Sequence, residues 1–128
     1  MAKEAIQTNK APKPIGIYSQ AIKAGELLFV SAQLPLQPNA TEIISNDPVE
    51  QIYQCFENLK NISEAAGSSL NQAVKINVYC ADSKVANNIN LVMEELFVEP
   101  YPARGVVKGD GFAKGARVAI EGIFSCVN

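Results

Sequence analysis

The segment from Arg117 to Val127 constrains the fold more than any other part of the sequence. It alternates like a β-strand, yet both of its faces carry apolar side chains: Val118, Ile120 and Phe124 on one face, Ala119 and Ile123 on the other. The segment from Leu27 to Leu34 has the same two-sided apolar character. A strand of this kind lies inside a sheet that is covered on both faces. Both faces of the sheet that contains these strands must therefore be covered.

One segment is a clear source of helical cover. Asp47 supplies an N-cap, Pro48 fits the first helical position, and Glu50 stands three residues after the cap. Apolar residues then recur at helical spacing over residues 49–66, and Gly67 offers a stop. We predict an amphipathic helix here.

A second helix is predicted from Ser83, as its cap, to a point before Pro100. Strands are predicted at residues 5–8, 18–23, 27–33, 73–80, 104–108 and 117–127, with a hairpin turn at residues 24–26. This order predicts a single α+β domain over residues 1–128, with a mixed sheet and two helices packed on one face. The other apolar face stays uncovered, which predicts a homo-oligomer with ligand sites in grooves between its subunits.

Missing residue types exclude several chemistries. The 128 residues contain no histidine, so Ser-His and Cys-His pairs and histidine metal sites are excluded. The three cysteines have no CxxC spacing, which favours buried thiols over a disulfide framework, a zinc site or a reactive nucleophile. There is no phosphate-binding loop or dinucleotide fingerprint. We therefore expect no metal and no cofactor.

The charge and the hydropathy of the chain limit the kinds of partner that it can have. The net charge is −2, and the lysines are scattered from Lys3 to Lys114 without a basic run, so nucleic acid is an unlikely partner. No window approaches the ~20 apolar residues of a membrane span, and the N-terminus has no apolar stretch long enough for a signal peptide. We expect a soluble, cytoplasmic protein with no membrane partner.

Two charged residues stand in apolar surroundings. Arg104 lies between a proline and an apolar run, where a guanidinium fork suits a carboxylate ligand; the alternatives are a solvated arginine or one paired for structure only. Glu121 interrupts the last apolar strand, where it suits acid-base work or pairs with a cation across the sheet. Tyr18 and Ser31 are weaker candidates, since a tyrosine at the start of a strand is usually there for packing and a serine in a strand usually has a satisfied hydroxyl.

Several motifs in this order resemble the Rid family, also called YjgF. They are residues 15–21 (IGIYSQA), 30–35 (VSAQLP), 58–67, 102–104 (PAR) and 120–121 (IE). The resemblance implies a trimer of chorismate mutase-like α+β domains with ligand sites in the clefts between subunits. It also implies hydrolytic deamination of reactive 2-enamine and 2-imine carboxylates, such as 2-aminoacrylate, to 2-keto acids and ammonia.

The resemblance also implies roles for individual residues. Arg104 is the clamp on the substrate carboxylate, and Glu121 positions or activates the hydrolytic water. Tyr18 and Ser31 line the pocket, and the Ala32 N–H replaces that of a usual glycine. Val106 lines the pocket where the family often has cysteine.

The chain departs from the family pattern around this pocket. Gly105 replaces a serine or a similar small residue, Lys108 stands where an acid is common, and Ala86 replaces an aromatic residue. The loop at residues 109–113 lacks a Leu-Pro step, and the connection over residues 97–101 is about three residues short. These changes predict a wider or differently shaped pocket.

Three classes of function follow. The first is the imine and enamine deaminase. The second is a non-catalytic protein that binds or senses a 2-keto acid or another small carboxylate in the same cleft. The third is an RNA-directed activity, which the acidic balance of the chain disfavours. Loss of Glu121 distinguishes the first two classes. If the protein is an enzyme, the loss abolishes turnover and spares the binding of a keto acid.

Overall fold

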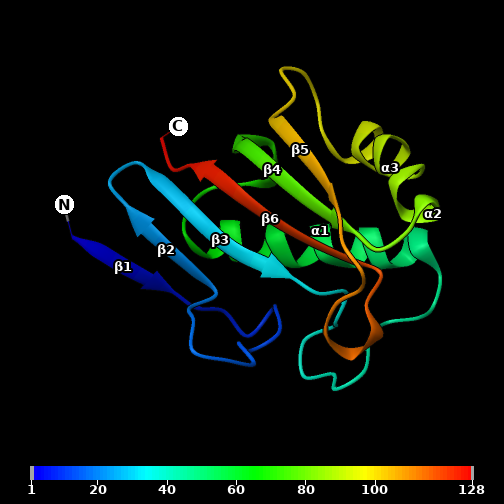
Figure 1. Cartoon of the computed structure of the whole chain (residues 1–128). Helices are drawn as coiled ribbons and strands as arrows, with labels where there is room; N and C mark the ends of the chain where they lie inside the picture. The colour runs from blue at the N-terminus through cyan, green and yellow to red at the C-terminus, as the bar shows by residue number, and fades with distance from the viewer. Residues whose placement is uncertain (1, 128) are drawn as a thin grey trace.

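The computed structural model describes residues 2–127, and its six strands form one mixed sheet (Figure 1). The strand order is β1-β2-β3-β6-β4-β5, with β4 and β5 parallel and every other pair of neighbours antiparallel. The strands are β1 (Lys3–Ile6), β2 (Ala21–Ala24), β3 (Leu27–Gln33), β4 (Ala73–Cys80), β5 (Ala103–Lys108) and β6 (Val118–Ser125). The predicted α+β class and mixed sheet are confirmed.

The last strand occupies the interior position that its two-sided apolar pattern predicted. β6 lies between β3 and β4, and helix α1 (Pro48–Ala65) packs against β6 and β3 behind the sheet (Figure 1). Val118, Ile120 and Phe124 are fully buried on that helix-covered face. The apolar side chains of this face and of α1 form the core.

Helix α1 begins and ends where the sequence predicts. The Asp47 carboxylate accepts a 2.8 Å hydrogen bond from the Glu50 N–H, and Pro48 opens the helix. At the other end Gly67 adopts a φ of 81°, a left-handed conformation that glycine takes without strain.

The predicted second helix is wrong as a continuous element. The structure has a single turn α2 (Ser83–Ala86) followed by α3 (Ile89–Leu96). The Asn88 side-chain amide donates to the Lys84 carbonyl at 2.7 Å, taking the acceptor that helical continuation offers to the Asn88 N–H. That N–H bonds the Val85 carbonyl instead, at 3.0 Å. The cap is also one residue earlier than predicted: the Asp82 carboxylate, not Ser83, accepts from the Val85 N–H at 3.1 Å.

The first strand ends two residues before its predicted end, and Tyr18 lies outside β2. The buried Gln20 side chain explains both differences. Its amide oxygen accepts from the Thr8 N–H at 2.8 Å, and its amide nitrogen donates to the Thr8 and Pro12 carbonyls at 3.1 and 2.9 Å. These bonds replace the ladder that a longer strand would make, and they hold the proline-rich segment as an ordered loop.

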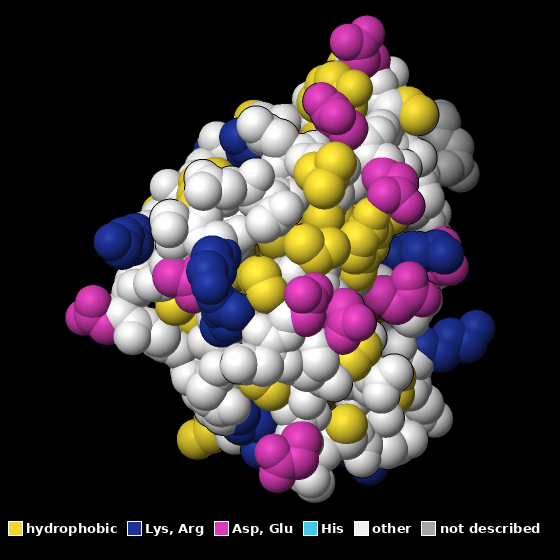
Figure 2. Space-filling model, turned by 90° about the vertical axis from the view of Figure 1, so that its right-hand side faces the viewer, with side chains coloured by type: hydrophobic (Ala, Val, Ile, Leu, Met, Phe, Trp, Pro, Cys, Tyr) yellow, Lys and Arg dark blue, Asp and Glu magenta, His cyan; other side chains and the backbone are white. Residues whose placement is uncertain are grey.

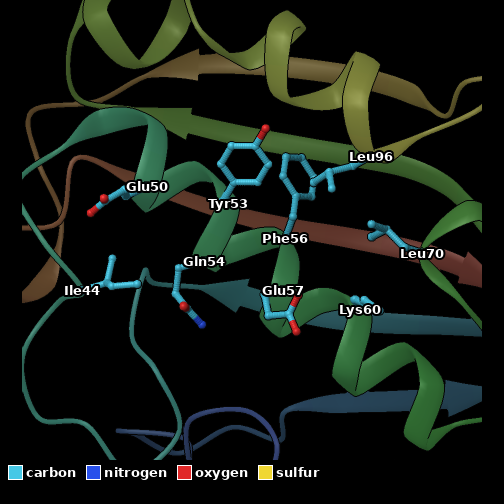
Figure 3. Close-up of a pocket in the computed structure, with 9 residues that line it drawn as sticks. All are labelled: Ile44, Glu50, Tyr53, Gln54, Phe56, Glu57, Lys60, Leu70 and Leu96. Atoms are coloured by element: carbon cyan, nitrogen blue, oxygen red, sulfur yellow. The ribbon is translucent and has the colours of Figure 1, made fainter.

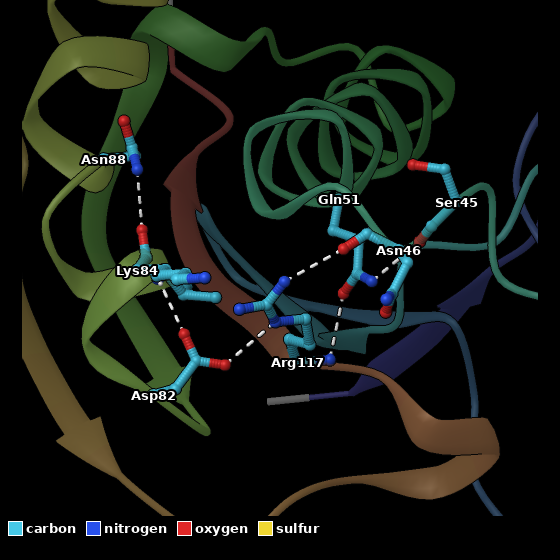
Figure 4. A network of polar contacts seen from close by, with 8 residues as sticks. Ser45, Asn46, Gln51, Asp82, Lys84, Asn88 and Arg117 are labelled. Atoms are coloured by element: carbon cyan, nitrogen blue, oxygen red, sulfur yellow. Dashed lines mark hydrogen bonds and ion pairs between the residues drawn. The ribbon is translucent and has the colours of Figure 1, made fainter.

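A second polar network joins three elements around Arg117 (Figure 4). Its guanidinium pairs with Asp82 at 2.9 Å and donates to the Asn46 carbonyl at 2.9 Å. Its backbone N–H donates to the side chain of Gln51, which is completely buried in α1. The network therefore ties the start of β6 to the starts of α1 and α2.

The cysteines match their predicted structural role. Cys55 and Cys80 are buried, Cys126 is partly buried, and all three are free thiols. Burial raises the pKa of the Cys55 thiol, which keeps it protonated and unreactive.

The second face of the sheet has no helix over it among residues 2–127. Leu27 and Phe29 of β3 are 39% and 43% exposed there, and Val107 of β5, level with Tyr79, is 52% exposed. We call this surface the open face. An exposed apolar sheet face of this kind is the one predicted from the sequence.

Candidate functional site

Arg104 lies on the edge strand β5, level with Ile76 of β4, and its side chain reaches towards α3. One guanidinium nitrogen (Nη1) donates to the Asn90 Oδ1 at 2.6 Å and lies 3.7 Å from the Met93 sulfur. The ion pair between Arg117 and Asp82 is the one salt bridge found in residues 2–127. Within this range Arg104 is therefore held by a neutral amide and has no carboxylate partner, and its side chain is exposed.

A pocket of about 250 Å³ opens beside the Arg104 guanidinium. Met93, Tyr101 and Pro102 give it an apolar wall, and Asn90 and Glu94 complete the lining. Val106 follows Arg104 on the same side of β5, level with Val78, and is 44% exposed. We call Arg104, Val106 and Asn90 the Arg104 group.

Glu121 lies on the open face, between β4 and an irregularity in β3. Register is lost in β3 between Val30 and Gln33, so the bulged residues Ser31 and Ala32 stand opposite Glu121. On the other side, the Asn77 amide donates to the Glu121 Oε2 at 3.1 Å, and the Tyr79 hydroxyl donates to the same oxygen at 2.9 Å. No cation pairs with Glu121 among residues 2–127, so the alternative of a cross-sheet ion pair is excluded.

The carboxylate changes the acidity of its neighbour. The hydrogen bond to Glu121, together with burial and the nearby negative charge, raises the pKa of Tyr79 above its ordinary value. The phenol therefore stays protonated as a donor throughout the neutral range. A hollow of about 190 Å³, lined by Phe29 and Ile123 among others, adjoins Glu121 and Asn77.

The remaining predicted residues lie on the β3 side of Glu121. The Ser31 hydroxyl donates to the Ser19 carbonyl at 2.6 Å, the satisfied state that was one of its two predicted interpretations. The Tyr18 hydroxyl accepts from the Ile15 N–H at 3.2 Å, and Tyr18 and Ala32 line a common small hollow. We call Glu121, Ser31, Ala32 and Tyr18 the Glu121 group.

A single chain does not bring the two groups together. Arg104 shares the side of Ile76, whereas Glu121 shares the opposite side with Asn77, the next residue of β4. β4 also separates β5 from β6, which places the two backbones about 10 Å apart. Arg104 and Glu121 of one chain are therefore on opposite faces of the sheet.

A second, larger hollow than the one beside Arg104 holds none of the predicted site residues. It is a groove of about 480 Å³ along α1 (Figure 3), with Tyr53, Phe56 and Leu96 among its lining. The Tyr53 hydroxyl bonds the carboxylate of Glu95 on α3. Figure 2 views the side of the molecule where α2 and α3 lie, and shows hydrophobic side chains with acidic ones beside them. The volume of a hollow alone therefore does not identify the functional site.

Sequence reasoning missed Asn77, Tyr79 and Met93. Asn77 and Tyr79 alternate with the apolar residues of β4, a pattern that looks like an ordinary solvent face until β6 sets Glu121 between them. Met93 and Asn90 fit the buried and the exposed side of the amphipathic helix α3, a pattern that gives no sign of a place beside Arg104.

Two kinds of feature are absent from residues 2–127. No helix there is long and apolar enough to cross a membrane. No cluster of three or more cysteine, aspartate or glutamate side chains is arranged to hold a metal ion within the same range.

Comparison with known proteins shows the family of the chain. A family model described as endoribonuclease L-PSP matches residues 8–126. A RutC family protein of Pyrococcus abyssi is 46% identical over 96% of this chain and 97% of its own length. The 2-iminobutanoate/2-iminopropanoate deaminase of Dermatophagoides farinae is 36% identical over 94% of each chain.

A solved structure also matches this chain. The crystal structure of RidA from an Antarctic Psychrobacter species superposes with a TM-score of 0.90 at 43% identity, covering 95% of this chain and 98% of its own. The chain therefore belongs to the Rid family, also called YjgF.

Proposed function

We propose that this protein hydrolyses 2-imine carboxylates, and the enamines that tautomerise to them, to 2-keto acids and ammonia. The observation that carries the proposal is Arg104, a guanidinium oriented by Asn90 with no carboxylate partner among residues 2–127. Such a fork is suited to a substrate carboxylate, through two parallel charge-assisted hydrogen bonds. The mite relative is named for this reaction on imines of two small keto acids.

The proposed site lies between subunits of a homotrimer. The Arg104 group and the Glu121 group occupy opposite faces of one chain, and the open face leaves apolar side chains uncovered. A neighbouring subunit that covers this face would set its own Arg104 group against Glu121. Each cleft then has a carboxylate clamp from one chain and a carboxylate base from the next.

The chemistry asks little of the protein beyond orientation. The imine carbon is already electrophilic, so Arg104 has to hold the substrate and Glu121 has to orient a water molecule and accept its proton. Addition of water to that carbon gives a carbinolamine once the proton taken up by Glu121 passes to the nitrogen. Transfer of the hydroxyl proton to the nitrogen, again through Glu121, then cleaves the C–N bond and releases ammonia and the 2-keto acid. The residues of the two groups are sufficient for these steps.

The side-chain end of the substrate has room beside the clamp. Val106 and the pocket wall formed by Met93, Tyr101 and Pro102 present apolar surface next to Arg104. This lining favours imines with apolar side chains over those with charged ones.

The test measures 2-keto acid release from enamines that a dehydratase generates in situ, with spontaneous hydrolysis subtracted. We expect Arg104→Ala to raise KM about 10- to 100-fold, because charge-assisted bonds to the carboxylate are lost. Glu121→Gln should lower kcat by about 100-fold or more and leave binding of a 2-keto acid intact. Lys84→Ala on the exposed side of α2 is the control and should match the wild type.

The outcomes separate enzyme from binder. A folded wild-type protein that accelerates none of several imines, yet binds 2-keto acids through Arg104, would be the non-catalytic carboxylate binder instead. RNA binding that weakens steeply with added salt would revive the RNA-directed class.

A further inference from the structure

The Glu121 carboxylate is held from one side only. Tyr79 and Asn77 both donate to Oε2, at 2.9 and 3.1 Å, and no hydrogen bond within residues 2–127 uses Oε1. Two donors on one oxygen fix the plane of the carboxylate and leave the second oxygen with its lone pairs free. This is the arrangement expected of a carboxylate that must present one oxygen in a set direction.

Both donors come from the same stretch of β4. Asn77 and Glu121 are direct cross-strand partners, and Tyr79 follows Asn77 on the same face of the sheet. β4 is a central strand paired on both sides, so these two side chains start from a rigid backbone. The Asn77 and Tyr79 side chains therefore hold the Glu121 carboxylate in a fixed position.

The missing side chain of Gly105 is part of the same arrangement. Gly105 is the cross-strand partner of Asn77 on β5, and a Cβ at Gly105 would lie 3.2 Å from the Asn77 Oδ1. A contact that short requires the amide to move by a few tenths of an ångström. Glycine at this position therefore leaves the space in which the Asn77 amide reaches Glu121.

We propose that Tyr79 and Asn77 are positioning residues, which hold Oε2 of Glu121 so that Oε1 faces the hydrolytic water. The inference rests on the proposed deaminase function and adds two residues to its site. Neither residue touches the substrate in this scheme. Both act through the direction of the Glu121 carboxylate, and Gly105 acts by making room for Asn77.

The structure also argues against a purely structural role for the cluster. A stabilising pair would need one donor for Glu121, and the exposed Val107, which lies level with position 79, offers an apolar surface to an apolar side chain there. Two neutral donors directed at Oε2 instead favour control of the direction in which the other carboxylate oxygen, Oε1, points.

The experiment compares Tyr79→Phe and Asn77→Asp with the wild type in the keto-acid assay. Both changes preserve size: the first removes a donor, and the second turns the donor into a repelling acceptor. We expect kcat to fall about tenfold in each variant, while KM and the affinity for a 2-keto acid stay within about twofold, because Arg104 is untouched. Gly105→Ser, which crowds Asn77, should fall in the same direction.

Specific results decide the question. An active wild type whose kcat is unchanged in Tyr79→Phe and Asn77→Asp would overturn this inference and leave the deaminase intact. A rise in KM equal to the fall in kcat would also overturn it, since that would place the residues in substrate binding. A folded wild type without turnover would overturn the proposed function itself, and this inference with it.

Discussion

The two arginines of this chain show how the environment of a residue separates ligand binding from structure. Arg117 has its charge neutralised by Asp82 and a second guanidinium nitrogen directed at a backbone carbonyl, so it serves the fold. Arg104 is oriented by Asn90, a neutral amide, which positions the guanidinium without cancelling its charge. An arginine held in this way keeps its attraction for a carboxylate.

Gly122 has a packing role that the sequence did not reveal. A Cβ at this position would lie 2.9 Å from the Phe124 ring and 3.0 Å from the Ile76 Cδ1. Glycine here lets two core side chains meet across β6 and β4.

We therefore expect Gly122→Ala to destabilise the fold by about 1–3 kcal/mol, through overpacking of a filled core. Chemical denaturation of the variant and the wild type measures the difference. Gly16→Ala is the matched control, since its Cβ would meet only Tyr18, at 3.4 Å and beyond. Equal stability of both variants would show that the core around Gly122 relaxes freely.

At the scale of elements, the sequence correctly predicted the helices and strands whose bounds follow from local rules. It failed where a side-chain amide competes with the backbone for hydrogen bonds. The bounds of α1 and β4 followed from capping and alternation. The second helix did not, because the Asn88 amide competes for the Lys84 carbonyl and breaks it. The predicted strand through Tyr18 failed similarly, because Gln20 satisfies the loop backbone. Tyr79 was missed because its partner Glu121 is 42 residues away.

The contact between β6 and α2 should give the stability of the protein a dependence on pH. The hydrogen bond from Arg117 holds the pKa of Asp82 below its ordinary value. The ion pair then contributes fully above the ordinary aspartate pKa of about 3.9, and its contribution disappears as the pH falls through the lowered folded-state value. Because both side chains are partly exposed, solvent reduces the size of this effect.

The variant Asp82→Asn tests this prediction, because asparagine keeps the cap of α2 and removes the ionisation. We expect its Tm to lie below that of the wild type at pH 7 and to approach it as the pH is lowered from about 5 to 2. Thermal unfolding followed by circular dichroism measures both curves. Parallel curves over this range would mean that the ion pair contributes no stability in solution.

At the scale of the whole molecule, the open face decides the assembly. Leu27 and Phe29 expose apolar surface on a sheet that α1 covers only from behind. We expect a particle of three times 13.8 kDa in sedimentation equilibrium, and Phe29→Glu should reduce it to single chains of 13.8 kDa by placing a charge in the interface. Ala65→Glu, at the exposed end of α1, should leave the assembly intact. A trimeric Phe29→Glu would place the interface on another surface.

The opposite orientation of Arg104 and Glu121 allows a sharper test of a composite site. At a substrate concentration well below KM, the Arg104→Ala and Glu121→Gln chains should each retain about a tenth of the wild-type rate or less when alone. If each cleft takes Arg104 from one chain and Glu121 from its neighbour, trimers refolded at random from an equal mixture of the two variants contain both native residues in about one quarter of all clefts. Activity should then recover to about one quarter of the wild type, measured as keto-acid release after refolding of the mixture. Mixed trimers verified by mass that stay inactive would mean that one chain supplies both residues to a cleft, which would require Arg104 to reach around the edge of β5.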